Sequence, residues 1–187
     1  MSERALSNTA YVILGFLDAE PRSGYEIKQA VDNTTRFFWA ASYGQIYPEL
    51  RRLRDEGLVE SERDDTGGRK RKVHRITEAG RRALREWLAE PALATELRDE
   101  KLLKLFFSTS AGGADEGREA GVEALEARAA EHTEIEQRLR ELEPMVLAKG
   151  DSAKLAVLRY GIELNAWGRR HCEEAANEMR RTGRRSA

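Results

Sequence analysis

Four consecutive basic residues, Arg69, Lys70, Arg71 and Lys72, follow the glycine pair Gly67-Gly68. Lys and Arg side chains neutralise phosphate groups, and the two glycines leave the preceding turn free to follow a groove. Residues 66–85 hold eight basic residues and one acidic residue, although the whole chain has a net charge of −1. We therefore predict that this segment contacts the phosphates of a nucleic acid. The alternative is a solvated charged loop.

A second group of polar residues opens a predicted helix over residues 42–56. These residues are Ser42, Tyr43, Gln45, Tyr47 and Arg51. Side chains near the N-terminus of a recognition helix reach base edges, and that terminus also attracts phosphate. We predict that Gln45 pairs bidentately with adenine, that the tyrosine hydroxyls bind phosphate, and that Arg51 adds a contact one turn later.

Each of these residues also has a purely structural interpretation. Ser42 and Gln45 fit a helix cap as well as a base contact. Tyr47 fits the core as well as the surface. Arg51 lies in a stretch of alternating charges, which is typical of an ion-paired helix surface. The sequence alone leaves these alternatives open.

The elements that would position these residues are three short helices and a hairpin. A first helix is predicted to close at Pro21, and Ser23 with Glu26 forms a capping box for a second. Ile46, Leu50 and Leu53 form the inward stripe of the third. Pro48 predicts a kink or a later start for this third helix.

The hairpin follows directly. Gly57 is predicted to end the third helix in a left-handed cap. Residues 58–63 and 72–76 are predicted strands, joined by a turn with two glycines. Thr77 is predicted to cap a further helix that ends near Pro91.

The second half of the chain has a helical pattern throughout. A short apolar helix over residues 97–107 precedes a long amphipathic helix, and Pro144 and Gly150 mark the turn into a last helix. This last helix has apolar or small polar residues at steps of three and four, which predicts a coiled-coil-like seam for a homodimer. The predicted dimerisation residues are Leu155, Leu158, Ile162, Asn165, Cys172 and Met179.

Residues 42–60 and 67–88 together resemble the PadR family of transcriptional regulators. The motifs that carry the resemblance are Tyr47-Pro48-x-Leu50-x-x-Leu53, Glu56-Gly57-Leu58-Val59 and Ile76-Thr77-Glu78-Ala79-Gly80. Val73-His74 departs from the family, in which many relatives carry aromatic residues there.

The resemblance implies a mainly α fold with a small β-hairpin. We expect a winged helix-turn-helix domain at residues 1–91 and a helical dimerisation domain at residues 92–187. The implied function is a homodimeric repressor or activator that binds an operator with an inverted repeat. Some family members are similar in responding to small aromatic compounds, so Trp39, Trp87, Phe106 and Trp167 are candidates for an effector pocket. The alternative for these aromatic residues is plain core packing.

Other classes of function find little support. The three histidines are scattered, and the sequence shows no catalytic constellation, metal site or cofactor motif. A lone Cys172, the lack of an apolar run of membrane-spanning length and the lack of a signal peptide favour a cytoplasmic protein without a membrane segment. A winged-helix adaptor for other proteins is the competing hypothesis. It does not need so much unpaired positive charge.

Overall fold

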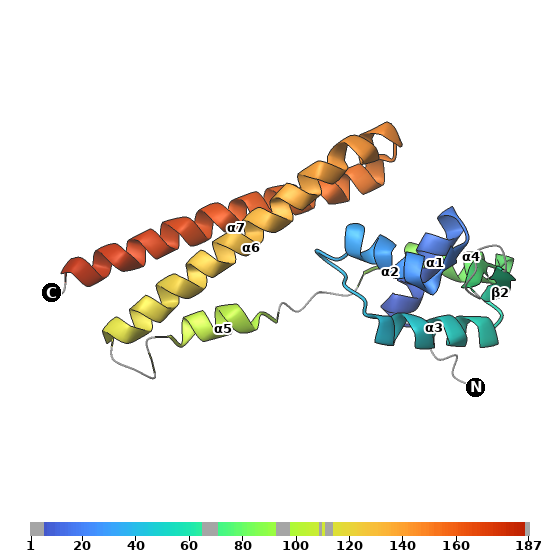
Figure 1. The fold of residues 1–187 in the computed structure, drawn as a ribbon, viewed down its shortest axis with the longest axis horizontal. Coiled ribbons are helices and arrows are strands. Elements are labelled where there is room, and N and C mark those ends of the chain that lie inside the picture. The colour runs from blue at the N-terminus through green and yellow to red at the C-terminus, as the bar shows by residue number, and fades with distance from the viewer. Residues whose placement is uncertain (1–5, 65–70, 93–97, 109, 111–113, 186–187) are drawn as a thin grey trace. The chain divides into compact units, whose positions relative to one another are not determined.

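The computed structural model describes residues 6–64, 71–92, 98–108, 110 and 114–185 (Figure 1). The chain divides into two compact units, residues 1–94 and residues 95–187. The N-terminal unit contains α1 (Asn8–Ala19), β1 (Arg22–Ser23), α2 (Gly24–Asn33), α3 (Tyr43–Asp55), β2 (Val59–Asp64), β3 (Arg71–Ile76) and α4 (Glu78–Ala89). The C-terminal unit contains α5 (Glu100–Phe106), α6 (Ala114–Ala148) and α7 (Ser152–Arg185).

The helices begin where short polar side chains can satisfy their free N–H groups. The Glu26 carboxylate accepts a hydrogen bond of 2.8 Å from the Ser23 backbone, and the Ser23 hydroxyl accepts one from the Glu26 N–H. Thr77 caps α4 by accepting from the Gly80 N–H. The predicted starts of α2 and α4 are thereby confirmed.

Helix α3 ends in the predicted left-handed cap. Gly57 has a φ of 73°, a conformation that costs glycine no steric strain. Its N–H donates to the Arg54 carbonyl, and the Leu58 N–H donates to the Leu53 carbonyl. This pair of bonds is a Schellman motif, and it turns the chain directly into β2.

Two prolines lie inside helices. Helix α3 begins at Tyr43 and continues through Pro48, so the later start is not observed. The carbonyl left without a donor belongs to Gly44, which is exposed and accessible to water. Likewise α6 continues past Pro144 to Ala148, and the chain turns at Gly150, whose φ is 68°.

The core of the N-terminal unit lies among its helices and its sheet. Each helix contributes a stripe of apolar residues at steps of three and four, and the strands close the core from one side. Its fully buried large members are Ile13, Leu14, Leu17, Ile27, Val31, Ile46, Leu53 and Val59. Through these stripes α3 packs against both α1 and α2.

The sheet has three antiparallel strands in the order β1-β3-β2. Val59 pairs with Ile76 and Asp64 with Arg71 across the hairpin, while Arg22 of β1 pairs with His74. The two-residue strand β1 is absent from the sequence prediction, because so short a strand leaves no alternating pattern.

The C-terminal unit is built on α6 and α7, which lie side by side and antiparallel (Figure 1). Val122, Leu125 and Ala129 of α6 pack with Cys172 and Ala176 of α7. Leu105 of α5 joins this cluster from its edge. The long helices thus bury much of their apolar surface within one chain.

Gly80 is expected to be essential for joining α4 to the hairpin. A Cβ at this position would lie 2.3 Å from the Leu58 carbonyl oxygen and 2.8 Å from Ile76 Cγ1. Gly80→Ala should therefore lower the free energy of unfolding by about 1–3 kcal/mol, measured by urea denaturation. Gly15→Ala in α1 is the matched control, because its Cβ meets no atom within 4 Å. It should stabilise by about 0.5–1 kcal/mol, and equal effects at both sites would contradict the account.

Candidate nucleic-acid interface

Helix α3 presents its polar residues to solvent because its apolar stripe is buried. Ile46, Leu50 and Leu53 are at most 2% exposed. The five residues of the helix and its cap that the sequence predicts to contact DNA lie on the remaining surface and are exposed: Ser42, Tyr43, Gln45, Tyr47 and Arg51. The fold therefore brings this predicted set together on one accessible surface.

Ser42 and Gln45 form the start of α3. The Gln45 side-chain oxygen accepts hydrogen bonds from the Ser42 backbone N–H at 2.9 Å and from the Ser42 hydroxyl at 3.1 Å. That oxygen is therefore occupied within the helix cap. The amide nitrogen of Gln45 is the group that remains to meet a ligand.

Tyr43 and Tyr47 lie one turn apart and form an aromatic pair on the surface. Their ring centroids are 6.1 Å apart and the rings are 20° from parallel. Each side chain is nearly half exposed, at 43% and 45%. A Cβ on Gly24 would lie 2.7 Å from the Tyr47 ring, so that ring packs directly against the start of α2. Tyr47 thus has both a packed edge and an accessible one.

The three arginines of α3 differ in their partners. Arg52 pairs with Glu56 at 2.8 Å, and Arg54 pairs with Asp55 at 2.9 Å. Arg51 is exposed and forms no ion pair or hydrogen bond with any residue in the described part of the chain. Arg51 is therefore available to bind an anion.

The β2–β3 hairpin, called the wing below, carries the basic cluster. Arg71 is the first residue of β3, and Lys72 follows it with an exposed side chain. Arg69 and Lys70 lie outside the described residues.

His74 lies at the base of the wing and is only 7% exposed. Its Nδ1 is 2.8 Å from the Ser61 hydroxyl on the neighbouring strand. Burial lowers the pKa of His74 below its ordinary value, and the charges of Lys72 and Arg54 lower it further. The neutral imidazole is therefore the form that the folded wing favours.

The predicted dimerisation residues lie inside the chain's own α6–α7 pair. Leu158, Ile162, Asn165 and Cys172 are buried, and Leu155 and Met179 are partly buried. Across the pair, the Asn165 side-chain oxygen accepts a hydrogen bond of 2.8 Å from His132 Nδ1. Burial raises the pKa of the Cys172 thiol. This seam is thus already occupied within one chain.

A second apolar stripe on α7 is exposed. Val157, Tyr160, Leu164 and Trp167 follow one another at steps of three and four, and each is between 43% and 65% exposed. Helix α5 also exposes Leu103 and Phe106, and Phe107, which follows its last residue, is exposed as well. Sequence spacing showed that α7 is amphipathic, but it could not show which stripe the chain itself covers.

The four aromatic candidates for an effector pocket differ in their surroundings. Trp87 stacks on Tyr11 with centroids 4.5 Å apart, at the edge of the N-terminal core. Trp167 stacks on His171 and is otherwise exposed. Phe106 is 77% exposed and Trp39 is 36% exposed.

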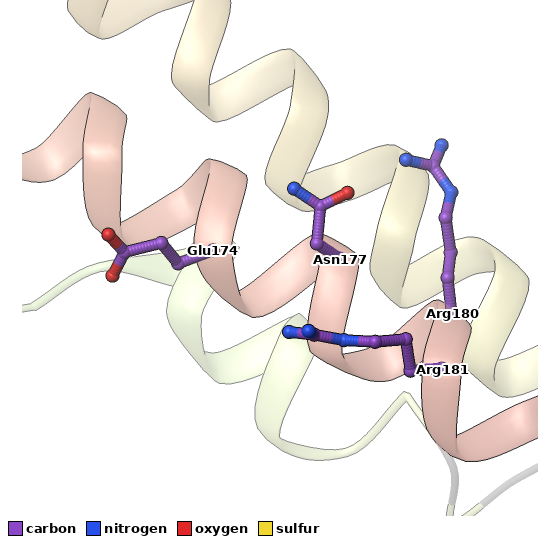
Figure 2. A pocket seen from close by; sticks show the side chains of 4 residues that line it. All are labelled: Glu174, Asn177, Arg180 and Arg181. Atoms are coloured by element: carbon purple, nitrogen blue, oxygen red, sulfur yellow. The ribbon is translucent and has the colours of Figure 1, made fainter.

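One cavity of the C-terminal unit, of about 430 Å³, is lined by polar side chains alone. Figure 2 shows Glu174, Asn177, Arg180 and Arg181, which project from α7 and line it. Arg180 is paired with Glu126 of α6 at 2.6 Å. None of the four aromatic candidates lines this cavity, and opposite charges leave it without a strong preference for either sign. Within the described residues, no cluster of His, Cys, Asp or Glu could hold a metal ion.

Three helices followed by an antiparallel wing define the winged helix-turn-helix class. The model of the transcriptional regulator PadR-like family matches residues 13–86, and that of the virulence activator alpha C-terminal domain matches residues 97–180. The chain is 30% identical to the negative transcriptional regulator PadR of Bacillus subtilis over 159 residues, which cover 82% of this chain and 87% of that protein. The chain belongs to the PadR family of transcriptional regulators.

Solved structures show the same fold. A PadR-like regulator from Bacillus cereus superposes with a TM-score of 0.80 at 21% identity, covering 94% of this chain and 99% of the other. Bacillus subtilis PadR in complex with operator DNA superposes with a TM-score of 0.79 at 24% identity, covering 93% and 98%. The same protein in complex with p-coumaric acid superposes with a TM-score of 0.69 at 24% identity, covering 91% of this chain and 97% of the other.

In the described part of the chain, none of the helices is both long and apolar enough to cross a membrane.

The lowered pKa of His74 predicts acid sensitivity. The unfolded chain binds a proton near the ordinary pKa of 6.5, whereas the folded chain resists it until lower pH. The stabilisation from neutral His74 should thus be complete above about pH 6.5 and decline as the pH falls toward the folded-state pKa. Urea denaturation across this range should show the decline in the wild type and a weaker one in His74→Gln. His171→Gln, at an exposed histidine, should show the same decline as the wild type. A His74→Gln variant with the same decline as the wild type would contradict the account.

Proposed function

We propose that this protein is a homodimeric repressor that binds operator DNA through α3 and the wing. The observation that carries the proposal is the exposed polar surface of α3, held by a fully buried apolar stripe. This surface contains Arg51, which has no partner among the residues that the structure describes. A recognition helix needs this combination, because bases and phosphates must be met by side chains on a rigid support. Bacillus subtilis PadR, a negative regulator by name, has been crystallised with operator DNA.

At the N-terminus of α3, the contacts follow from the groups left free. The Gln45 amide nitrogen can donate one hydrogen bond to N7 of a purine or to O6 of guanine, because its oxygen is held in the cap. This single hydrogen bond takes the place of the bidentate adenine contact expected from the sequence. The hydroxyls of Tyr43 and Tyr47 and the Arg51 guanidinium supply donors for phosphates.

The wing supplies most of the sequence-independent attraction. Arg69, Lys70, Arg71 and Lys72 act as cations for the backbone phosphates, whose counterions are released on binding. A protein adaptor has no comparable need for this charge, so a steep dependence on salt separates the two functions.

A second copy of the chain is proposed to cover the exposed stripe of α7, formed by Val157, Tyr160, Leu164 and Trp167. Exposed apolar side chains in such a row are typical of an interface and unfavourable in water. A two-fold dimer would present two α3 helices to two half-sites of an inverted repeat.

A small aromatic effector is the last part of the proposal. Bacillus subtilis PadR has been crystallised with p-coumaric acid. Trp39, Phe106 and Trp167 keep exposed aromatic surface that could stack on such a compound, whereas Trp87 already stacks on Tyr11. Repression of chromosomal genes would place the protein in the cytoplasm, and it requires no catalytic activity.

Neutralising the wing tests its proposed interaction with phosphates. A variant with Gln in place of Arg69, Lys70, Arg71 and Lys72 should bind a random-sequence duplex more weakly. The slope of log affinity against log salt should fall by about 0.9 for each phosphate that the variant no longer neutralises. The control replaces four cations of the C-terminal unit with Gln: Arg138, Lys149, Lys154 and Arg170. Equal slopes for the two variants, measured by fluorescence anisotropy, would favour the adaptor.

Charge on the exposed stripe should break the proposed dimer. Leu164→Asp places a carboxylate among apolar side chains that a second copy would cover, and desolvating it costs several kcal/mol. Light scattering after size exclusion should therefore give the mass of one chain, and operator affinity should drop. Arg170→Asp, also exposed on α7, is the matched control and should remain a dimer. A dimeric Leu164→Asp variant would show that the interface lies elsewhere.

A further inference from the structure

Lys28 of α2 lies over the ring of Tyr43, with its Nζ 5.5 Å from the ring centroid. A cation in this position is attracted by the negative face of the ring, more strongly where water is excluded. The Lys28 side chain is only 12% exposed, so it cannot reach far into solvent. The lysine therefore touches the aromatic surface of α3 from the neighbouring helix.

An acidic residue on the same helix fixes the position of Lys28. Its ammonium donates to Asp32, one turn later on α2, and Asp32 also accepts from Arg36 at 2.9 Å. The Lys28 hydrogen bond is the main cause that holds the pKa of Asp32 below its usual range. Asp32 is thus a charged anchor that keeps the ammonium at a defined position.

The second tyrosine is held by the same helix. The Tyr47 ring packs on Gly24, where any Cβ would collide with it at 2.7 Å. Tyr43 and Tyr47 stack on each other, so both ends of the pair are fixed by α2. Rotation of either ring would break contacts at Lys28, at Gly24 or between the rings.

We propose that Lys28 is a positioning residue for DNA recognition, which orients Tyr43 and through it Tyr47 without itself contacting DNA. This inference rests on the proposed DNA-binding function and assigns a role in it to α2. Tyrosines held in one orientation lose less conformational freedom on binding, so affinity and sequence preference both benefit.

The salt dependence of binding separates positioning from direct contact. A lysine that neutralised a phosphate would reduce the salt slope by about one when removed. Removal of a lysine that only orients a tyrosine would lower the affinity for DNA and leave the salt slope unchanged. Lys28→Met keeps the apolar stem and removes the charge, and Lys28→Arg restores a cation over the ring.

The binding experiment uses the full chain and a labelled duplex that the wild type selects from a randomised library. Lys28→Met should weaken binding roughly fivefold to tenfold, the range expected for a partly desolvated cation–π contact, with an unchanged salt slope. Lys28→Arg should recover most of the affinity. Asp32→Asn, which removes the anchor but keeps Lys28, should show a smaller loss with the same slope. A slope reduced by about one in Lys28→Met would overturn the proposal in favour of a phosphate contact.

A second measurement needs no DNA. Lys28→Met, Tyr43→Leu and the double variant form a thermodynamic cycle in urea denaturation, and the two substitutions should be non-additive because the residues are in contact. Additive effects would overturn the assignment to Lys28. Full-strength duplex binding by Lys28→Met would overturn it as well. Failure of the wild type to select any duplex would instead overturn the proposed function.

Discussion

The burial of one face of α3 is the constraint on which the rest of the N-terminal unit depends. Ile46, Leu50 and Leu53 are nearly inaccessible to water, and each contributes about 1.5–3 kcal/mol when fully buried. Because successive residues of a helix point in fixed directions, this burial also decides which side chains face outward. The residues proposed to contact DNA are therefore selected by packing, before any ligand is present.

The exposed face is organised by contacts that leave few groups free. The cap at Ser42 occupies the oxygen of Gln45, and acidic neighbours occupy Arg52 and Arg54. Among the described residues of this face, the donors that remain are the Gln45 amide nitrogen, two tyrosine hydroxyls and Arg51. A surface whose groups are already oriented loses less entropy on binding, which favours a specific site over a general cationic one.

Local signals in the sequence predicted most of this architecture. Helix ends are marked by Ser23 with Glu26, by Thr77 and by Gly57. Their hydrogen bonds join residues that are close in sequence, so the sequence alone predicts them.

Features that depend on residues distant in sequence could not be predicted from the sequence alone. The spacing of Leu158 and Ile162 shows an apolar stripe, but only the fold shows that α6 covers it. Likewise no local pattern links Lys28 to Tyr43, because they lie fifteen positions apart on different helices. The turn predicted at Pro144 was wrong, because α6 continues past it to Ala148. The helical residues on both sides stabilise the helix by more than the one missing hydrogen bond costs.

The most direct test is to incubate the purified protein with sheared genomic DNA from its source, recover the bound fragments and sequence them. The account predicts enrichment of a few fragments that share an inverted repeat, with half-sites about one helical turn apart, or roughly 34–36 Å. Uniform recovery of all fragments, or recovery of none at moderate salt, would contradict a dimeric operator-binding repressor.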